Sequence, residues 1–191
     1  LVLGCYFSMF EGCTSLTQAP SLPATTLASS CYYHMFSGTN VLPDCSNINF
    51  SSTSVVSSGG LKGLFSGTKD TDADLERILP KNSNGKYCLP VTTLADSCYG
   101  DMFRDCTSLT TAPELPATKL ISSCYQYMFN GCSKLNYIKA MFTTTPSVSY
   151  TNNWVRGVAS TGKFVKNKNA TWNVTGTYAI PEGWSIQSAA Q

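Results

Sequence analysis

Charged side chains, histidine and long apolar runs are all scarce in this chain of 191 residues. Only 13% of the residues are charged, which is about half the usual share, and the formal net charge is +2. A chain with so little charge offers no electrostatic basis for binding nucleic acid or an anionic membrane surface. No apolar run approaches the roughly 18 residues of a membrane-spanning helix, so no such segment is predicted.

The residues of common catalytic sites are missing as well. His34 is the only histidine, and no serine lies in a nucleophile motif, so a Ser–His–Asp triad cannot be assembled. The position of His34 beside an apolar stripe favours a surface side chain over a ligand. Zinc sites cluster Cys and His at short spacing, whereas the cysteines here are spread along the chain. The sequence therefore predicts no enzyme activity, no metal and no cofactor.

What the chain does contain is a repeat of roughly 26 residues, a period within the range that is typical of proteins built from stacked units. The period is the interval from Cys5 to Cys31 and again from Cys98 to Cys124. Segments 5–23 and 98–116 share the frame Cys-Tyr-x-x-Met-Phe-x-x-Cys-Thr-Ser-Leu-Thr-x-Ala-Pro-x-Leu-Pro. Units of this kind stack because no unit can bury its apolar stripe alone. The sequence predicts an α/β solenoid.

Each unit is predicted to hold one short helix and one short strand. In residues 27–36 the apolar side chains recur at i, i+1, i+4, i+5, i+8 and i+9, which favours a helix with one buried stripe. Gly38 follows where such a helix would end. The Thr-rich run after the second cysteine is closed by a proline, such as Pro113, and predicts a strand.

The nine cysteines are predicted to be mainly reduced packing residues. Six of them fall in the repeat as equally spaced pairs, such as Cys98 and Cys106, and Thr39 replaces the second cysteine of one pair. A position that accepts threonine favours a small buried side chain over an obligatory disulfide, and an odd count leaves at least one cysteine unpaired.

The third of about five predicted units is degenerate and lengthened. The interval from Phe36 to Phe65 is slightly longer than the period, and the interval from Phe65 to Phe103 exceeds the period by nearly half. The extra residues lie near 68–78 or 81–86. Insertions in repeat proteins map to loops on one face, which is often the binding face.

Four carboxylates occur at alternate positions in this insertion, and such spacing can wrap calcium: Asp70, Asp72, Asp74 and Glu76. The segment lacks the glycine at the sixth position and the distant glutamate of an EF-hand loop. That difference favours a solvated acidic loop, with calcium as the alternative.

The chain is predicted to divide into a repeat domain, residues 1–150, and a small β-rich cap, residues 151–191. The repeat pattern is lost after Ile138, and the three tryptophans all lie in the cap. Residues 163–166 and 171–174 alternate as strands do, with a turn between them at 167–169. The chain also begins part-way through a unit, which favours the loss of earlier repeats and an export signal.

The frame Cys-Tyr-x-x-Met-Phe-x-x-Cys-x-x-Leu and the return Leu-Pro-Ala-Thr-Thr-Leu resemble the BspA-like leucine-rich repeats of Bacteroidetes surface proteins. The resemblance covers roughly three quarters of the chain, and the tail from Trp154 to Trp184 is similar to the ending often found on such proteins. It implies a right-handed solenoid with strands on its concave face. It also implies an extracellular or outer-membrane-associated location and a role in adhesion or protein binding.

Variable positions on the predicted strands are the candidate ligand-binding residues: Thr17, Gln18, Thr110, Thr111, Asn136 and Tyr137. Side chains that point off a sheet face can form a recognition surface, although an ordinary solvated strand face is the alternative. The first functional hypothesis is a non-enzymatic surface module that binds a host or bacterial protein. The second is a carbohydrate-binding domain that uses the tail tryptophans or Tyr137, and the third is a structural spacer in a larger surface or phage-tail protein.

Overall fold

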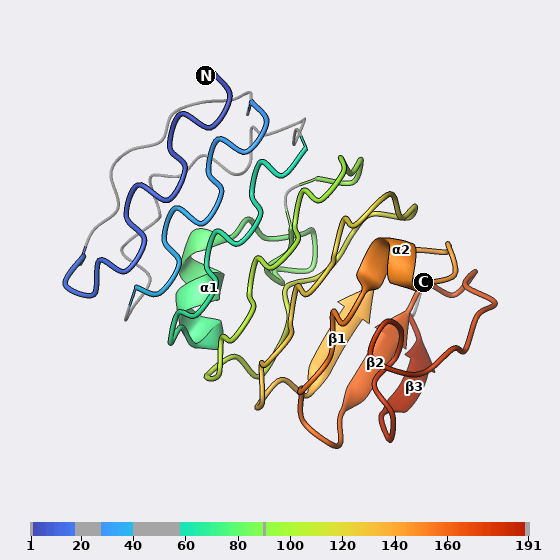
Figure 1. The fold of residues 1–191 in the computed structure, drawn as a ribbon. Helices are drawn as coiled ribbons and strands as arrows, with labels where there is room; N and C mark the ends of the chain where they lie inside the picture. Colours follow the sequence, from blue (N-terminus) through green and yellow to red (C-terminus); the bar gives the residue numbers. More distant parts are fainter. Residues whose placement is uncertain (1, 18–27, 40–57, 90, 190–191) are drawn as a thin grey trace.

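The computed structural model describes residues 2–17, 28–39, 58–89 and 91–189 (Figure 1). Its regular elements are, in chain order, α1 (Asp72–Ile78), β1 (Tyr137–Ala140), α2 (Val148–Thr151), β2 (Lys163–Lys166) and β3 (Ser185–Ser188). Neither helix of this described part is long and apolar enough to cross a membrane. Much of the remaining backbone consists of tight turns that recur with the sequence repeat.

The helix predicted at residues 27–36 is wrong. Leu27 lies outside the described residues, and residues 29–38 form a continuous series of turns. Ser30, His34 and Gly38 have positive φ, so the backbone changes direction at every fourth residue. The same series occurs in six turn segments: residues 3–12, 29–38, 58–67, 96–105, 122–131 and 152–157.

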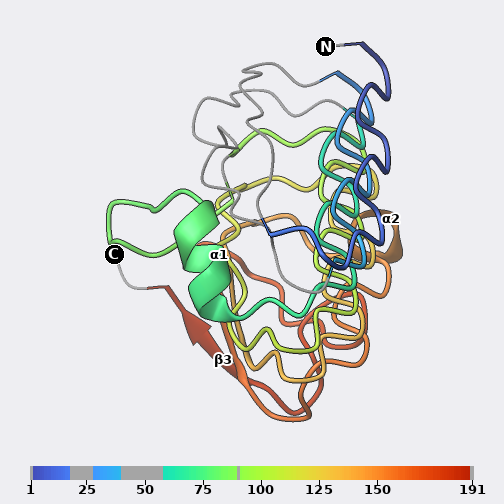
Figure 2. The ribbon, with the colours of Figure 1, turned by 90° about the vertical axis from the view of Figure 1, so that its left-hand side faces the viewer.

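Backbone hydrogen bonds join each turn segment to the next. The Tyr32 amide donates to the Gly60 carbonyl of the neighbouring segment at 3.1 Å, and the Tyr33 amide donates to Ser30 of its own segment at 3.3 Å. This alternation repeats along the segments and gives partners to buried amides that a helix would satisfy internally. The turn segments form one layer of the molecule, and α1 and β3 lie on the opposite side (Figure 2).

Residues that tolerate positive φ explain why the turns form at these positions. Within the turn segments every fourth residue has positive φ, and most of these residues are glycine, aspartate, asparagine or serine. Glycine adopts this conformation freely, and aspartate and asparagine adopt it more readily than most other residues. A side chain at Gly63 would also meet the His34 ring, which would have to shift to make room. His34 is half-buried against this segment, and burial lowers the pKa of its imidazole.

Aromatic side chains stack from unit to unit in the core. The ring centroids of Phe36 and Phe65 are 6.5 Å apart, those of Phe65 and Phe103 are 5.9 Å apart, and those of Phe103 and Phe129 are 5.8 Å apart. All four rings are buried. The Met-Phe pairs at 35/36, 102/103 and 128/129 therefore fill the space behind the turn segments, where burial of each large side chain contributes roughly 1.5–3 kcal/mol, whereas Met9 of the first pair is exposed.

The three strands form one parallel sheet in the order β1-β2-β3. The strand predicted at residues 163–166 is confirmed as β2, but residues 171–174 are not a strand and no hairpin forms. Strand β2 pairs with β1 on one side and with β3, which was not predicted, on the other. This sheet therefore crosses the predicted domain boundary at residue 151, which falls within α2.

The repeat does not end after Ile138, because the last turn segment is another copy of the motif. The Phe129 amide donates to the Trp154 carbonyl at 2.8 Å, and Gly157 lies against Gly131 as Gly67 lies against Gly38. Trp154 thus occupies the place of Met128, one period further along the chain. Because tryptophan replaces methionine at this position, a comparison of residue types does not recognise the last copy of the repeat.

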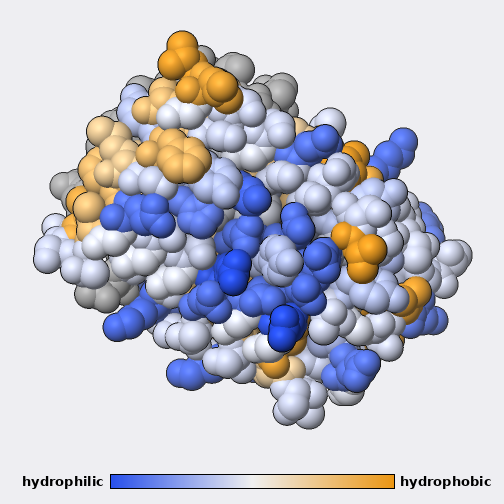
Figure 3. Space-filling view, in the orientation of Figure 1, coloured by the Kyte–Doolittle hydropathy of each residue, from blue (hydrophilic) through white to orange (hydrophobic). Residues whose placement is uncertain are grey.

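Polar and apolar side chains gather on different parts of one face. Figure 3 shows the face formed by the turn segments, where hydrophilic side chains cover the centre and apolar side chains gather over the N-terminal segment. Large exposed apolar residues of that segment are Val2, Leu3, Phe7 and Met9. The candidate site described below lies on the opposite side of the molecule, where α1 is found (Figure 2).

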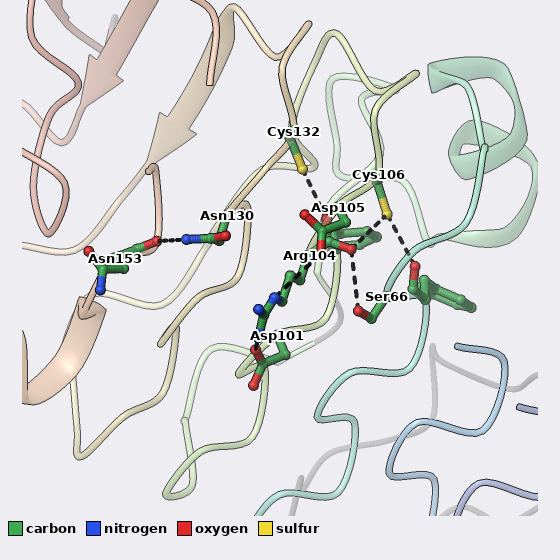
Figure 4. A network of polar contacts seen from close by, with 10 residues as sticks. Ser66, Asp101, Arg104, Asp105, Cys106, Asn130, Cys132 and Asn153 are labelled. Atoms are coloured by element: carbon green, nitrogen blue, oxygen red, sulfur yellow. Dashed lines mark hydrogen bonds and ion pairs between the residues drawn. The ribbon is translucent and has the colours of Figure 1, made fainter. Parts of the chain in front are cut away.

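The eight cysteines in the described part of the chain are free thiols. Cys106 and Cys132 each donate a hydrogen bond to a phenylalanine carbonyl of the preceding turn segment, at 3.1 and 2.9 Å (Figure 4). In the same position of earlier units the Thr39 and Thr68 hydroxyls donate at 3.0 Å to the phenylalanine carbonyl of their own turn segment. The position requires a small side chain with a donor, which explains the exchange of cysteine for threonine.

We expect alkylation with iodoacetamide at pH 8 to modify Cys5 and Cys13 rapidly and to spare the core cysteines. Cys5 and Cys13 are exposed, whereas burial raises the pKa of Cys98 and Cys106 to about 12, so almost no thiolate forms there. Mass spectrometry of the labelled peptides, with and without denaturant, measures the protection. Equal labelling of all four thiols in the native protein would contradict the packing described here.

Candidate functional site

A groove of about 580 Å³ lies between the insertion and the strands. Its outer wall comes from α1 and the segment after it: Asp72, Glu76, Asn82, Asn84, Lys86 and Tyr87. Its floor comes from the strand positions of the last two predicted repeat units: Thr111, Ala112, Glu114, Asn136, Tyr137 and Lys139. The groove is therefore built where residues that interrupt the repeat face residues that vary within it.

Helix α1 forms where the sequence predicted an acidic loop. Thr71 precedes it, and both the amide and the hydroxyl of Thr71 donate to the Asp74 carboxylate, at 2.9 and 2.8 Å. These two bonds hold the residue before the helix against its first turn. Leu75 and Ile78 are buried and fix one face of the helix against the core.

The Asp72 carboxylate fastens the start of α1 to the floor of the groove. One oxygen accepts the backbone amides of Thr110 and Thr111, at 2.9 and 3.1 Å, and the other accepts the Thr110 hydroxyl. On the opposite side Thr111 pairs with Tyr137 as neighbouring parallel strands do. Asp72 therefore supplies the acceptor that a preceding strand would otherwise provide.

A short hairpin, with Lys81 paired antiparallel to Tyr87, completes the outer wall. The Asn82 side-chain oxygen accepts the amides of Asn84 and Lys86, at 2.9 and 3.0 Å, and so holds the turn. The Tyr87 hydroxyl donates to the Thr111 carbonyl at 2.6 Å. Burial, reinforced by nearby carboxylates, raises the pKa of this phenol well above its usual value, so it remains a donor.

Glu114 of the floor is held both by an ion pair within the floor and by a hydrogen bond from the wall. The Lys139 ammonium lies 3.1 Å from one oxygen of Glu114, and the Asn82 side-chain amide donates to the other at 2.6 Å. The Glu114 side chain is only 14% exposed, so solvent screens this pair less than it would a surface pair. The oxygens of Asp72 and Glu114 are therefore engaged by the protein itself, whereas Glu76, the third carboxylate of the groove, is exposed on the outer wall.

The groove brings together three of the six predicted site residues: Thr111, Asn136 and Tyr137. Thr110 lies beside the groove, but its amide and hydroxyl are used by Asp72. Thr17 is exposed in the first unit and does not line the groove, and Gln18 lies outside the described residues.

The four carboxylates proposed as a calcium site do not act together. Asp72 binds the floor of the groove, Asp74 binds Thr71, Asp70 is buried, and Glu76 is exposed on the groove wall. In the described ranges of the chain no group of three or more His, Cys, Asp or Glu side chains is arranged to hold a metal ion. The structure thus replaces the predicted acidic loop with a helix whose acidic residues have separate roles.

Sequence reasoning did not name the other groove residues that come from the insertion: Asn82, Asn84, Lys86 and Tyr87. The signal for them was the added length of the third unit, which placed extra residues near 68–78 or 81–86 without indicating their conformation. Glu114 was detectable as a position that differs between copies, since Ser21 takes its place in the first unit.

Comparisons with known proteins add no identification. No family model matches the chain, and no curated protein or solved structure matches it. The function therefore has to be inferred from the groove and from the sequence repeat alone.

Proposed function

We propose that the chain is a non-enzymatic binding module of a secreted or surface-displayed bacterial protein, built from BspA-like leucine-rich repeats. Its ligand is a component of a host or bacterial surface and lies in the groove. The observation that carries the proposal is the groove itself, because an insertion and the variable strand positions converge on it. In repeat proteins such insertions commonly serve binding.

The chemistry of the groove supports binding over catalysis. General acid–base catalysis requires a carboxyl group that can exchange a proton with the substrate. Both oxygens of Asp72 and both oxygens of Glu114 already accept hydrogen bonds or an ion pair from the protein. These two carboxylates are therefore arranged to shape the groove, and Glu76 alone does not provide the pair of carboxyl groups that glycoside hydrolysis uses.

The tail does not provide the sugar-stacking platform that the three tryptophans suggested. The exposed fractions are only 0% for Trp154, 5% for Trp172 and 6% for Trp184, so the ring faces are not accessible to a ligand. Trp154 and Trp184 also donate their indole N–H groups to the carbonyls of Ala179 and Ala159. The tryptophans belong to the core, and the groove remains the better site.

Filling the groove tests this proposal. We expect Asn84→Trp to abolish binding of the fluorescently labelled protein to bacterial envelopes and host extracellular matrix, because the bulky ring occupies the cavity. Ser83→Trp is the matched control, since Ser83 is exposed on the same hairpin but does not line the groove. Bound ligand should be recovered chemically unchanged.

Two results would count against the proposal. Full binding by Asn84→Trp would place the ligand elsewhere on the molecule. Absence of binding by the unaltered protein to every surface would favour the structural spacer.

A further inference from the structure

Two acidic side chains of the groove, Glu114 and Asp72, already bind partners within the protein. Glu114 is held by Lys139 and Asn82, and Asp72 is held by the floor. The other charged side chains among the described lining residues are Glu76 and Lys86 on the outer wall, which are opposite in sign. A charged ligand could pair only with one of these two exposed side chains, where an ion pair contributes little, or would have to disturb the Glu114–Lys139 pair, which is unfavourable.

The groove is also poorly suited to an extended peptide. Peptides commonly add a strand to an open sheet edge or insert an apolar side chain into a pocket. The edge at Thr111 is closed, because Asp72 accepts its amide and Tyr87 donates to its carbonyl. Among the described lining residues, Ala112 is the sole aliphatic one and is itself buried.

The groups that the groove leaves available are neutral and polar. The side-chain amides of Asn84 and Asn136 and the hydroxyl of Tyr137 make no hydrogen bond to any described residue. Each of these groups can both donate and accept, as the hydroxyls of a sugar do. The half-buried Tyr137 ring adds an apolar surface against which the C–H face of a sugar ring can pack.

We propose that the groove binds a neutral oligosaccharide chain. This inference rests on the proposed function, since it names the ligand class of the same groove. The cavity volume of about 580 Å³ lies within the roughly 300–1,000 Å³ usual for ligand sites. Asn84 and Asn136 lie on opposite sides of the groove, on the hairpin and on the floor, so a chain between them can be bonded from both sides.

Binding of the full chain to three sets of probes tests the proposal: neutral hexose oligosaccharides of several linkages, sialylated and sulfated oligosaccharides, and peptides of the extracellular matrix. We expect binding to members of the neutral set alone. Raising the salt concentration from about 50 mM to about 500 mM should change that affinity less than about twofold, because screening acts on charges.

Variants separate the groove from the rest of the surface. Tyr137→Ala should weaken neutral-sugar binding about tenfold, the upper range for loss of one aromatic contact, and Tyr137→Phe should weaken it less. Asn136→Ala should weaken it severalfold. Tyr127→Ala removes a half-buried tyrosine from the fifth turn segment instead and should leave the affinity unchanged. Unchanged circular dichroism spectra and melting temperatures identify the variants that remain folded.

The outcomes distinguish the ligand class from the proposed function. Binding of a peptide or an anionic glycan that Asn84→Trp abolishes would overturn the neutral-sugar proposal and leave the groove as a binding site. Neutral-sugar binding that survives both Tyr137→Ala and Asn136→Ala would overturn the assignment of these residues. If no set of probes binds, the neutral-sugar proposal fails, and the proposed function fails with it only if the unaltered protein also binds no bacterial envelope and no host matrix.

Discussion

Replacing Trp154 by alanine should lower the free energy of unfolding by about 3–5 kcal/mol, as truncation of a large buried ring usually does. Trp154 is fully buried, and its ring centroid lies 6.0–6.3 Å from those of four other aromatic residues: Tyr125, Phe129, Phe142 and Phe164. Its indole N–H also donates to the Ala179 carbonyl at 2.9 Å. The alanine variant would leave a cavity and a buried acceptor without its donor.

Urea unfolding followed by circular dichroism measures this loss, and the melting temperature should fall by about 2–4 °C for each kcal/mol. Trp154→Phe is the control, because it keeps most of the ring volume and removes the indole donor; its loss should be nearer about 1–2 kcal/mol. A change for Trp154→Ala below about 1 kcal/mol, far under the usual cost of such a truncation, would mean that the last turn segment does not share the core of the others.

Trp154 also shows why the extent of the repeat was misjudged. The spacing of one period continues from Met128 to Trp154 and from Gly131 to Gly157, but the apolar residues change type. A comparison of residue types therefore recognises the repeat only as far as Ile138. The backbone hydrogen bonds show that it continues through the last turn segment. Spacing was the more reliable signal, because the turns depend on backbone conformation at fixed positions and the core accepts several apolar side chains.

The helix prediction failed because periods of 3.6 and 4 are hard to separate over so short a segment. The apolar pairs Cys31-Tyr32 and Met35-Phe36 suit either period. The distinguishing feature was the residue two places after each pair, which is small, polar or glycine in most copies and has positive φ, as in His34 and Gly38. A helix requires no such residue, whereas a chain of turns does. The leucine-rich repeat class stays a prediction.

The candidate site was predictable only where it follows the repeat. Thr111, Asn136 and Tyr137 occupy strand positions that vary between copies, so alignment of the copies exposed them. Asn82 and Tyr87 belong to an insertion that has no second copy to compare. Their conformation depends on tertiary contacts with Glu114 and Thr111, which local sequence patterns do not encode.

The second large effect is expected at Asp72. Asp72→Ala should lower the free energy of unfolding by about 2–3 kcal/mol. The reason is that the Thr110 amide, the Thr110 hydroxyl and the Thr111 amide, all partly buried, would lose their charged acceptor. The amides of Thr110 and Thr111 should then exchange with deuterium faster than in the unaltered protein. Glu76→Ala is the control on the same helix, since its exposed side chain makes no such contact, and its unfolding curve should not shift.

A double-mutant cycle isolates the contact between helix and floor. Thr110→Val removes one donor from Asp72 while keeping the side-chain volume. If the carboxylate holds the insertion in place, Asp72→Ala and Thr110→Val should be less than additive, with a coupling energy of about 0.5–3 kcal/mol. Additive losses with protected Thr110 and Thr111 amides would contradict this role. Because Asp72 completes the strand edge and α1 forms the outer wall, loss of the contact should weaken ligand binding as well as folding.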